Sequence, residues 1–156
     1  AAGVDASKDI LKMAVVERHK NTRHIGIGYL KGYGLKSGAV ATSVAHDSHN
    51  IICVGTNDED MAFAVNRIAR NRGGIVVVEN GQVLAELPLE IAGIISGKPL
   101  REVNTLLEDA KKAAHALGVG TDIDPFMTLS FMSLPVIPTL RLTTRGVVDV
   151  NTQQYV

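Results

Sequence analysis

The chain of 156 residues is long enough for one domain with its own core, and its 46% hydrophobic and 21% charged residues are typical of a globular protein. Sixteen basic and sixteen acidic residues cancel, which argues against a general nucleic-acid-binding protein, because such proteins carry a basic excess. A single cysteine, Cys53, excludes an internal disulfide, and no apolar run is long enough for a membrane helix. We therefore expect a cytoplasmic protein that binds neither nucleic acid nor membrane.

The first part of the sequence is typical of β-strands. Apolar and polar residues alternate at the start of segment 10–20, which predicts a strand followed by a polar exit. Five glycines within segment 24–39 suit neither a helix nor a regular strand, and they indicate an edge strand or extended loop with close backbone approach. Two further apolar runs, 38–45 and 50–56, are predicted to be strands.

Two amphipathic helices are expected. The first begins after Asn57, a good N-cap followed by three acidic residues that suit the positive end of the helix dipole, and it ends at Gly73. The second lies within segment 98–120, where apolar residues recur at three- and four-residue steps. Pro99 fits its first turn, and Gly118 fits the position just past its C-terminus.

A β-hairpin is predicted between the two helices. Two β-rich runs in segment 74–88 flank Asn80-Gly81, the pair preferred in a type I′ turn. The C-terminal segment 121–150 is apolar and interrupted by prolines. There we expect a short strand or helix around Phe126 to Leu134, followed by a loop.

These elements indicate one mixed α/β (α+β) domain over residues 1–156, with a mixed β-sheet, an Asn-Gly hairpin and two main helices. Cys53 is expected to be a small buried residue. Two phenylalanines and two methionines of the C-terminal segment are expected to fill the core: Phe126, Met127, Phe131 and Met132.

The stretch "SVAHDSHNI", residues 43–51, concentrates polar groups between two predicted strands. Its five consecutive polar residues are His46, Asp47, Ser48, His49 and Asn50. Four interpretations are open: a metal site, a catalytic pair, the rim of a ligand pocket, or a polar turn that stabilises itself. The flanking strands place the stretch at a sheet edge, where a pocket can form.

Spacing alone does not separate these interpretations. On a helix, His46 and His49 lie on one face and can share a metal, whereas on a turn they need not converge. Asp47 is then a third ligand or a carboxylate that orients an imidazole. In a polar turn, the Asp and Ser side chains instead bond to nearby backbone N–H groups. Asp122 and Asp124, which precede a proline, suit a hard cation but are more typical of turn chemistry.

Three long motifs resemble a known family. They are "GYGLKSGAVATSVAHDSHNIICVGTNDEDMAFAVN", then "GGIVVVENGQVLAELPLEIAGIIS", and finally "DPFMTLSFMSLPVIPTLRLTTRGVVDV". In this order they resemble the C-terminal region of bacterial adenine deaminases of the amidohydrolase superfamily, from about His24 to about Val150. The sequence begins with alanine instead of methionine, which fits a C-terminal domain without the rest of its enzyme.

The resemblance implies a hydrolase of purine metabolism that converts adenine and water to hypoxanthine and ammonia. A binuclear manganese or iron centre would activate the water, with ligands that include an HxH pair in an N-terminal barrel of roughly 250 residues. This chain has no HxH and is too short for such a barrel. We therefore expect no metal ligand or cofactor here. The expected partners are the chain's own N-terminal barrel, adenine and further copies in a homo-oligomer.

The candidate site residues come from the "AHDSHN" motif, which resembles a hallmark of this domain. Asp47 and His49 are candidates for proton transfer or substrate contact, and His46, Ser48 and Asn50 are candidates for substrate binding. In this hypothesis the motif lines or closes the adenine pocket of the barrel, and the chain alone is inactive. The alternative is a non-catalytic assembly or oligomerisation module, whose apolar contact surface includes Phe126 to Leu134.

Overall fold

A six-stranded sheet forms the centre of the computed structural model, which describes residues 3–156. Its strands lie in the order β2-β1-β4-β3-β5-β6, so β2 and β6 are the two edges. Their bounds are β1 Ile10–Val16, β2 Ile25–Lys31, β3 Ala39–Thr42, β4 Ile51–Gly55, β5 Gly74–Glu79 and β6 Gln82–Pro88. A 3-10 turn, Ala6–Lys8, precedes β1.

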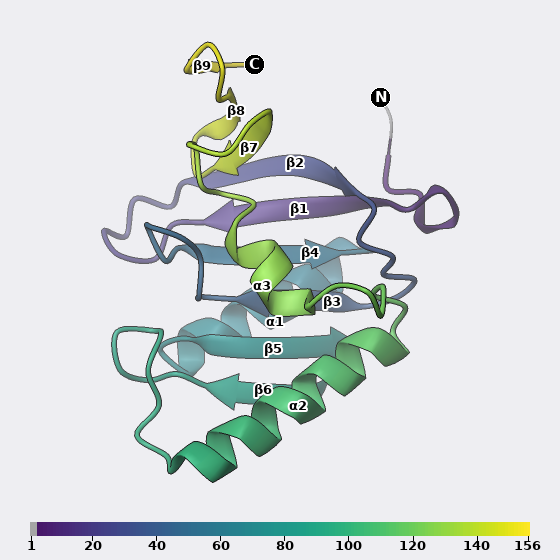
Figure 1. Cartoon of the computed structure of the whole chain (residues 1–156), viewed down its shortest axis with the longest axis vertical. Coiled ribbons are helices and arrows are strands. Elements are labelled where there is room, and N and C mark those ends of the chain that lie inside the picture. Colours follow the sequence, from purple (N-terminus) through teal and green to yellow (C-terminus); the bar gives the residue numbers. More distant parts are fainter. Residues whose placement is uncertain (1–2) are drawn as a thin grey trace.

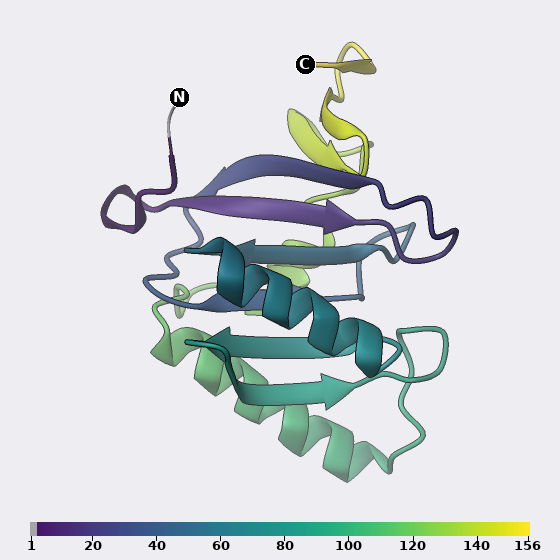
Figure 2. The same ribbon diagram turned by 180° about the vertical axis from the view of Figure 1, so that it is seen from behind.

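Helices cover both faces of the sheet. The long helix α2 (Leu100–Ala116) and the short helix α3 (Pro125–Ser130) lie on one face, as Figure 1 shows. Helix α1 (Asp58–Arg70) crosses the opposite face, over β3, β4 and β5 (Figure 2). None of the helices in residues 3–156 has the length and apolarity needed to cross a lipid bilayer.

Each face of the sheet has its own core. Successive side chains of a strand point to opposite faces, so in β4 Ile52 and Val54 pack towards α2 and α3, while Ile51 and Cys53 pack towards α1. The central strands are buried on both sides, which explains their continuous apolar runs. Cys53 is fully buried, as expected from the sequence.

The predicted fold class is confirmed, and the sheet is antiparallel in every neighbouring pair instead of mixed in direction. A helix between two strands often joins parallel neighbours, and α1 does join β4 to β5. Here β4 and β5 do run parallel to each other, but β3 lies between them and is antiparallel to both.

Local signals placed the start of α1, the end of α2 and the hairpin correctly, whereas α1 ends at Arg70 instead of Gly73, and the first left-handed φ after it, 60°, belongs to Arg72. The Asn57 side chain accepts a hydrogen bond from the Asp60 N–H at 2.8 Å, and Gly118 follows the C-cap of α2 with φ of 108°. Asn80 and Gly81 both have positive φ, 51° and 70°, as a type I′ turn requires. The buried Asp60 carboxylate accepts the N–H groups of both turn residues, at 3.2 and 2.8 Å. It therefore joins the start of α1 to the hairpin.

The C-terminal segment differs from the prediction. After α3, the expected loop contains a second, three-stranded sheet: β7 (Leu140–Thr143), β8 (Gly146–Asp149) and β9 (Gln154–Tyr155). Strands of two to four residues are too short to show a period of two, and Pro135 and Pro138 obscure the pattern further. The β7–β8 hairpin packs against β2 (Figure 1).

Glycines of β2 form the seat of this hairpin. A Cβ atom at Gly26 would lie 1.7 Å from the Thr143 carbonyl oxygen, so only glycine allows the contact. At Gly28 the nearest side-chain atom, on Leu142, would be 3.4 Å away. The predicted edge strand with close backbone approach is thus confirmed.

The expectation that four side chains of the C-terminal segment fill the core is only partly correct. Phe126 is buried and Met132 is half-buried, but Met127 and Phe131 are exposed. Helix α3 has only six residues, and its buried face is completed by Pro125, Phe126, Leu129 and Ser130. Met127 and Phe131 therefore lie on its outer side.

Candidate functional site

The predicted polar stretch connects the two central strands β3 and β4. It lies at the end of the sheet where three other connections also lie, 17–24, 71–73 and 89–99 (Figure 1). The sequence placed the stretch at a sheet edge, and this is wrong, because β3 and β4 occupy the middle of the strand order. Residues 46–48 form a turn, but within residues 3–156 neither the Asp47 nor the Ser48 side chain accepts a backbone N–H as the self-stabilising interpretation expected. The side chain that does so is His49, through Nδ1.

Ser43 anchors the base of the stretch. Its side chain is completely buried, and its hydroxyl accepts the Gly74 N–H at 2.7 Å and donates to the Gly93 carbonyl at 2.6 Å. Its own N–H donates to the Gly74 carbonyl at 2.9 Å. One serine therefore connects its own loop to the start of β5 and to the loop 89–99.

Arg18 clamps the stretch from the β1–β2 loop, a role that the sequence did not reveal. Its Nε donates to the His49 carbonyl at 2.8 Å and its Nη2 to the Ala92 carbonyl at 2.7 Å. The guanidinium lies against Gly93, where a Cβ atom would come within 2.5 Å of Nη2. Burial lowers the pKa of Arg18, but an arginine remains protonated at neutral pH after any moderate shift. Sequence patterns give no signal for such a clamp, because its partners are distant from Arg18 in the sequence.

Glu17 shapes the loop that carries this arginine. Its carboxylate accepts the backbone N–H groups of His19, Lys20 and Thr22. Burial alone would raise the pKa of Glu17, but these hydrogen bonds outweigh it and lower the pKa to about 2. His19, which follows Arg18, makes a second contact with the stretch: its Nε2 lies 2.6 Å from the Ser48 carbonyl oxygen.

His49 is fixed in one neutral tautomer. Its Nδ1 accepts the Ala45 N–H at 3.1 Å, so the ring proton resides on Nε2. Burial, followed by the neighbouring His46 and Arg18, lowers the pKa of His49. Backbone φ of 49° and a 2.6 Å bond from its N–H to the Ala45 carbonyl close the turn. At neutral pH His49 is thus a hydrogen-bond donor through Nε2 and is not equipped to act as a base.

His46 is held by α3 and the residues after it. Its N–H donates to the Ser130 carbonyl at 2.8 Å, and its carbonyl accepts the Ser133 hydroxyl at 3.2 Å. Its ring packs on Phe131 with centroids 4.8 Å apart, and it meets the His49 ring at 5.7 Å in a T-shaped arrangement. The structure therefore brings the two imidazoles together.

The other three candidates have different environments. Asp47 and Ser48 are exposed, and within residues 3–156 no hydrogen bond joins Asp47 to either imidazole. The Asn50 side chain accepts the Arg18 N–H at 3.2 Å and donates to the Ser48 hydroxyl at 3.2 Å. Asn50 therefore holds the turn together, while Asp47 is the carboxylate available to a partner.

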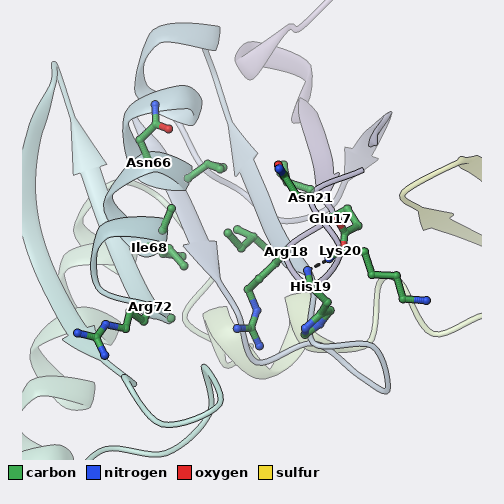
Figure 3. Close-up of a pocket in the computed structure, with 13 residues that line it drawn as sticks. Glu17, Arg18, His19, Lys20, Asn21, Asn66, Ile68 and Arg72 are labelled. Atoms are coloured by element: carbon green, nitrogen blue, oxygen red, sulfur yellow. Dashed lines mark hydrogen bonds between the residues drawn. The ribbon is translucent and has the colours of Figure 1, made fainter. Parts of the chain in front are cut away.

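Cavities lie on both sides of the turn. Asp47, Ser48 and Asn50 line one of about 380 Å³, with walls from residues 133–136 and 143–144. A larger one, of about 770 Å³, opens between the β1–β2 loop and α1. Figure 3 shows Arg18 and His19 on the loop side of this cavity, and Ile68 and Arg72 on the α1 side. Both volumes are within the range of small-molecule sites.

A metal site has no support from the described residues. Across residues 3–156, no three His, Cys, Asp or Glu side chains are grouped so that they could hold an ion. In "GTDIDPF", Asp124 caps α3, accepting the N–H groups of Phe126 and Met127 at 3.0 and 2.9 Å, and it pairs with Lys111 at 3.0 Å. The donor set for a binuclear centre does not exist in this part of the chain.

Comparison with known proteins agrees with these observations. A family model described as "Adenine deaminase C-terminal domain" matches residues 1–154. An adenine deaminase of Nitratidesulfovibrio vulgaris is 54% identical over 147 residues, which cover 94% of this chain and 26% of that protein. The adenine deaminase of Bacillus subtilis is 47% identical over 152 residues, 97% of this chain and 26% of that protein. This chain thus spans about a quarter of the length of the curated relatives it matches.

Proposed function

Because this chain belongs to the adenine deaminase C-terminal domain family, we propose that it is the C-terminal part of an enzyme that hydrolyses adenine to hypoxanthine and ammonia. In this proposal the chain is inactive alone. The manganese or iron centre belongs to an N-terminal barrel, as the family resemblance implies, and residues 3–156 contain no group of three side chains that could hold it. The chain's own contribution is the turn from His46 to Asn50, which lines or closes the adenine pocket.

The rigid presentation of the turn carries this proposal. Arg18 and Ser43 fix it from one side and α3 from the other, so its polar side chains are held in place before any ligand arrives. His49 offers an N–H through Nε2, which suits an acceptor nitrogen of a purine ring. The exposed Asp47 carboxylate offers acceptor oxygens, which suit the exocyclic amine.

The test uses the full-length enzyme. We expect Asp47→Ala and His49→Ala to lower kcat/KM for adenine by about tenfold or more, since loss of one good hydrogen bond costs about 1.4 kcal/mol. Thermal unfolding of Asp47→Ala should stay unchanged, because the side chain is exposed. The matched control is Asp122→Ala, which removes another exposed carboxylate. Unchanged turnover in both turn variants would contradict the proposed role.

An assembly role is the second candidate, and one observation favours it. Apolar side chains are exposed on and after α3: Met127 is 56% exposed and Val136 70%. Such side chains mark a contact surface when they are contiguous. Under this alternative, Met127→Asp would change the oligomeric state measured by light scattering but leave the rate per protomer unchanged. Under the pocket-lining proposal, the oligomer would persist.

A further inference from the structure

Edge strand β2 exposes a row of large apolar side chains on the face that carries α1. Ile25, Ile27 and Tyr29 are 55%, 57% and 53% exposed. They alternate with Gly26 and Gly28, which face the β7–β8 hairpin on the other side. Helix α1 packs on β3, β4 and β5 and leaves this end of the sheet uncovered (Figure 2).

Ile25 and Ile27 form one wall of a groove, and Tyr29 follows them on the same face of β2. Ala14 and Val16 of β1 line its floor, and Met61 and Val65 of α1 line its opposite wall, around a volume of about 490 Å³. The groove continues into the 770 Å³ cavity of Figure 3, because Val16, Val65 and Asn66 line both. An apolar channel therefore leads from β2 to the loops around the candidate site.

The end of the groove near the site is basic. Arg18, Lys20 and Arg72 line it, and within residues 3–156 none of the three forms an ion pair. The one acidic residue in this lining, Glu17, already accepts three backbone N–H groups. The partly buried Arg18 bonds only to neutral carbonyls, although buried charges are ordinarily compensated. This end of the groove thus suits a carboxylate.

We propose that the groove receives a segment of the N-terminal part of the enzyme, with apolar side chains on β2 and an acidic side chain at Arg18. The relatives are about four times as long as this chain, so a large part of the polypeptide exists to cover an uncovered face. Arg18 and His19 also bond to the candidate turn, so a domain that meets the turn lies beside the groove. The proposal rests on the chain's place in a larger enzyme and is independent of any contact with adenine.

Hydroxyl-radical footprinting of the full-length enzyme tests the docking surface. In this chain Tyr29 and Tyr155 are similarly exposed, 53% and 58%, so Tyr155 is the internal reference for a half-exposed tyrosine. Relative to the same residues in unfolded enzyme, we expect Tyr29 to lose most of its labelling, together with Ile25 and Ile27. Labelling of Tyr29 at the rate of a half-exposed tyrosine overturns the proposal. So does protection that disappears on dilution to the monomer, because a second copy of the chain then covers the groove.

Substitutions in the full-length enzyme test the occupant. Ile27→Lys and Arg72→Glu should restore Tyr29 labelling, the first by placing a charge on the apolar wall and the second by replacing a cation of the groove lining with a charge that repels the carboxylate. Leu84→Lys is the matched control on the other edge strand, where Leu84 is 46% exposed, and it should change nothing. Equal labelling in Ile27→Lys and Leu84→Lys overturns the assignment. The test measures labelling and not turnover, so its result remains valid even if the proposed catalytic role of the turn is wrong.

Discussion

Replacement of Ser43 by alanine should destabilise the chain far more than its size suggests. The substitution leaves two buried backbone groups without partners, the N–H of Gly74 and the carbonyl of Gly93. An unsatisfied buried polar group costs about 1–3 kcal/mol, so the two together should lower the free energy of unfolding by about 2–6 kcal/mol. That is a large fraction of the roughly 5–15 kcal/mol that stabilises a typical domain.

Urea unfolding followed by circular dichroism measures this loss directly. In thermal unfolding, 1 kcal/mol shifts the melting temperature of a chain of this length by roughly 2–4 °C, so Ser43→Ala should lower it by about 4–24 °C. Ser48→Ala is the control in the same stretch, and its exposed position limits the expected change to about 0.5 kcal/mol. If the two variants unfold at the same urea concentration, Ser43 does not anchor the loops as inferred from its hydrogen bonds.

Three further predictions concern other parts of the molecule. Gly26→Ala should cost about 1–3 kcal/mol of stability in urea unfolding because its Cβ would lie 1.7 Å from the Thr143 oxygen, whereas Gly28→Ala should be tolerated; equal effects would argue against the glycine seat. The NMR titration midpoint of His49 should lie below the ordinary pKa of 6.5, so that stability falls as pH drops below 6.5; a midpoint at or above this value would contradict the assigned tautomer. Burial alone would raise the pKa of Asp60, but its hydrogen bonds outweigh burial and lower the pKa below 3.8. The stability difference between wild type and Asp60→Ala should therefore be full at neutral pH and shrink as pH falls below about 4. A stability difference independent of pH would refute this.

Much of the fold was predictable because its signals are local. The Asn57 cap, the Asn80-Gly81 turn and the glycine after α2 each act within a few residues, so their patterns are visible in the sequence. The second sheet was not predictable, since its short strands are defined by contacts with β2. Gly26 indicated a close backbone approach, but the sequence does not show which segment approaches it.

The candidate site was predictable in its residues but not in its architecture. The sequence singled out the stretch from His46 to Asn50, and the structure does bring the two imidazoles together. No sequence pattern indicated Arg18 or Ser43, because both bond to backbone carbonyl and N–H groups of segments that are distant in sequence. The tautomer of His49 likewise follows from one backbone N–H that only the folded turn supplies.

The polar turn is also the only connection between the two central strands of the sheet. Its backbone bonds to α3 and to the β1–β2 loop, so any insertion or deletion within it would alter how β3 pairs with both of its neighbours. Substitutions in this stretch must therefore satisfy two constraints: the pairing of the central strands, and any role that the side chains have. Single side-chain exchanges at exposed positions such as Asp47 should therefore be tolerated more readily than changes in loop length.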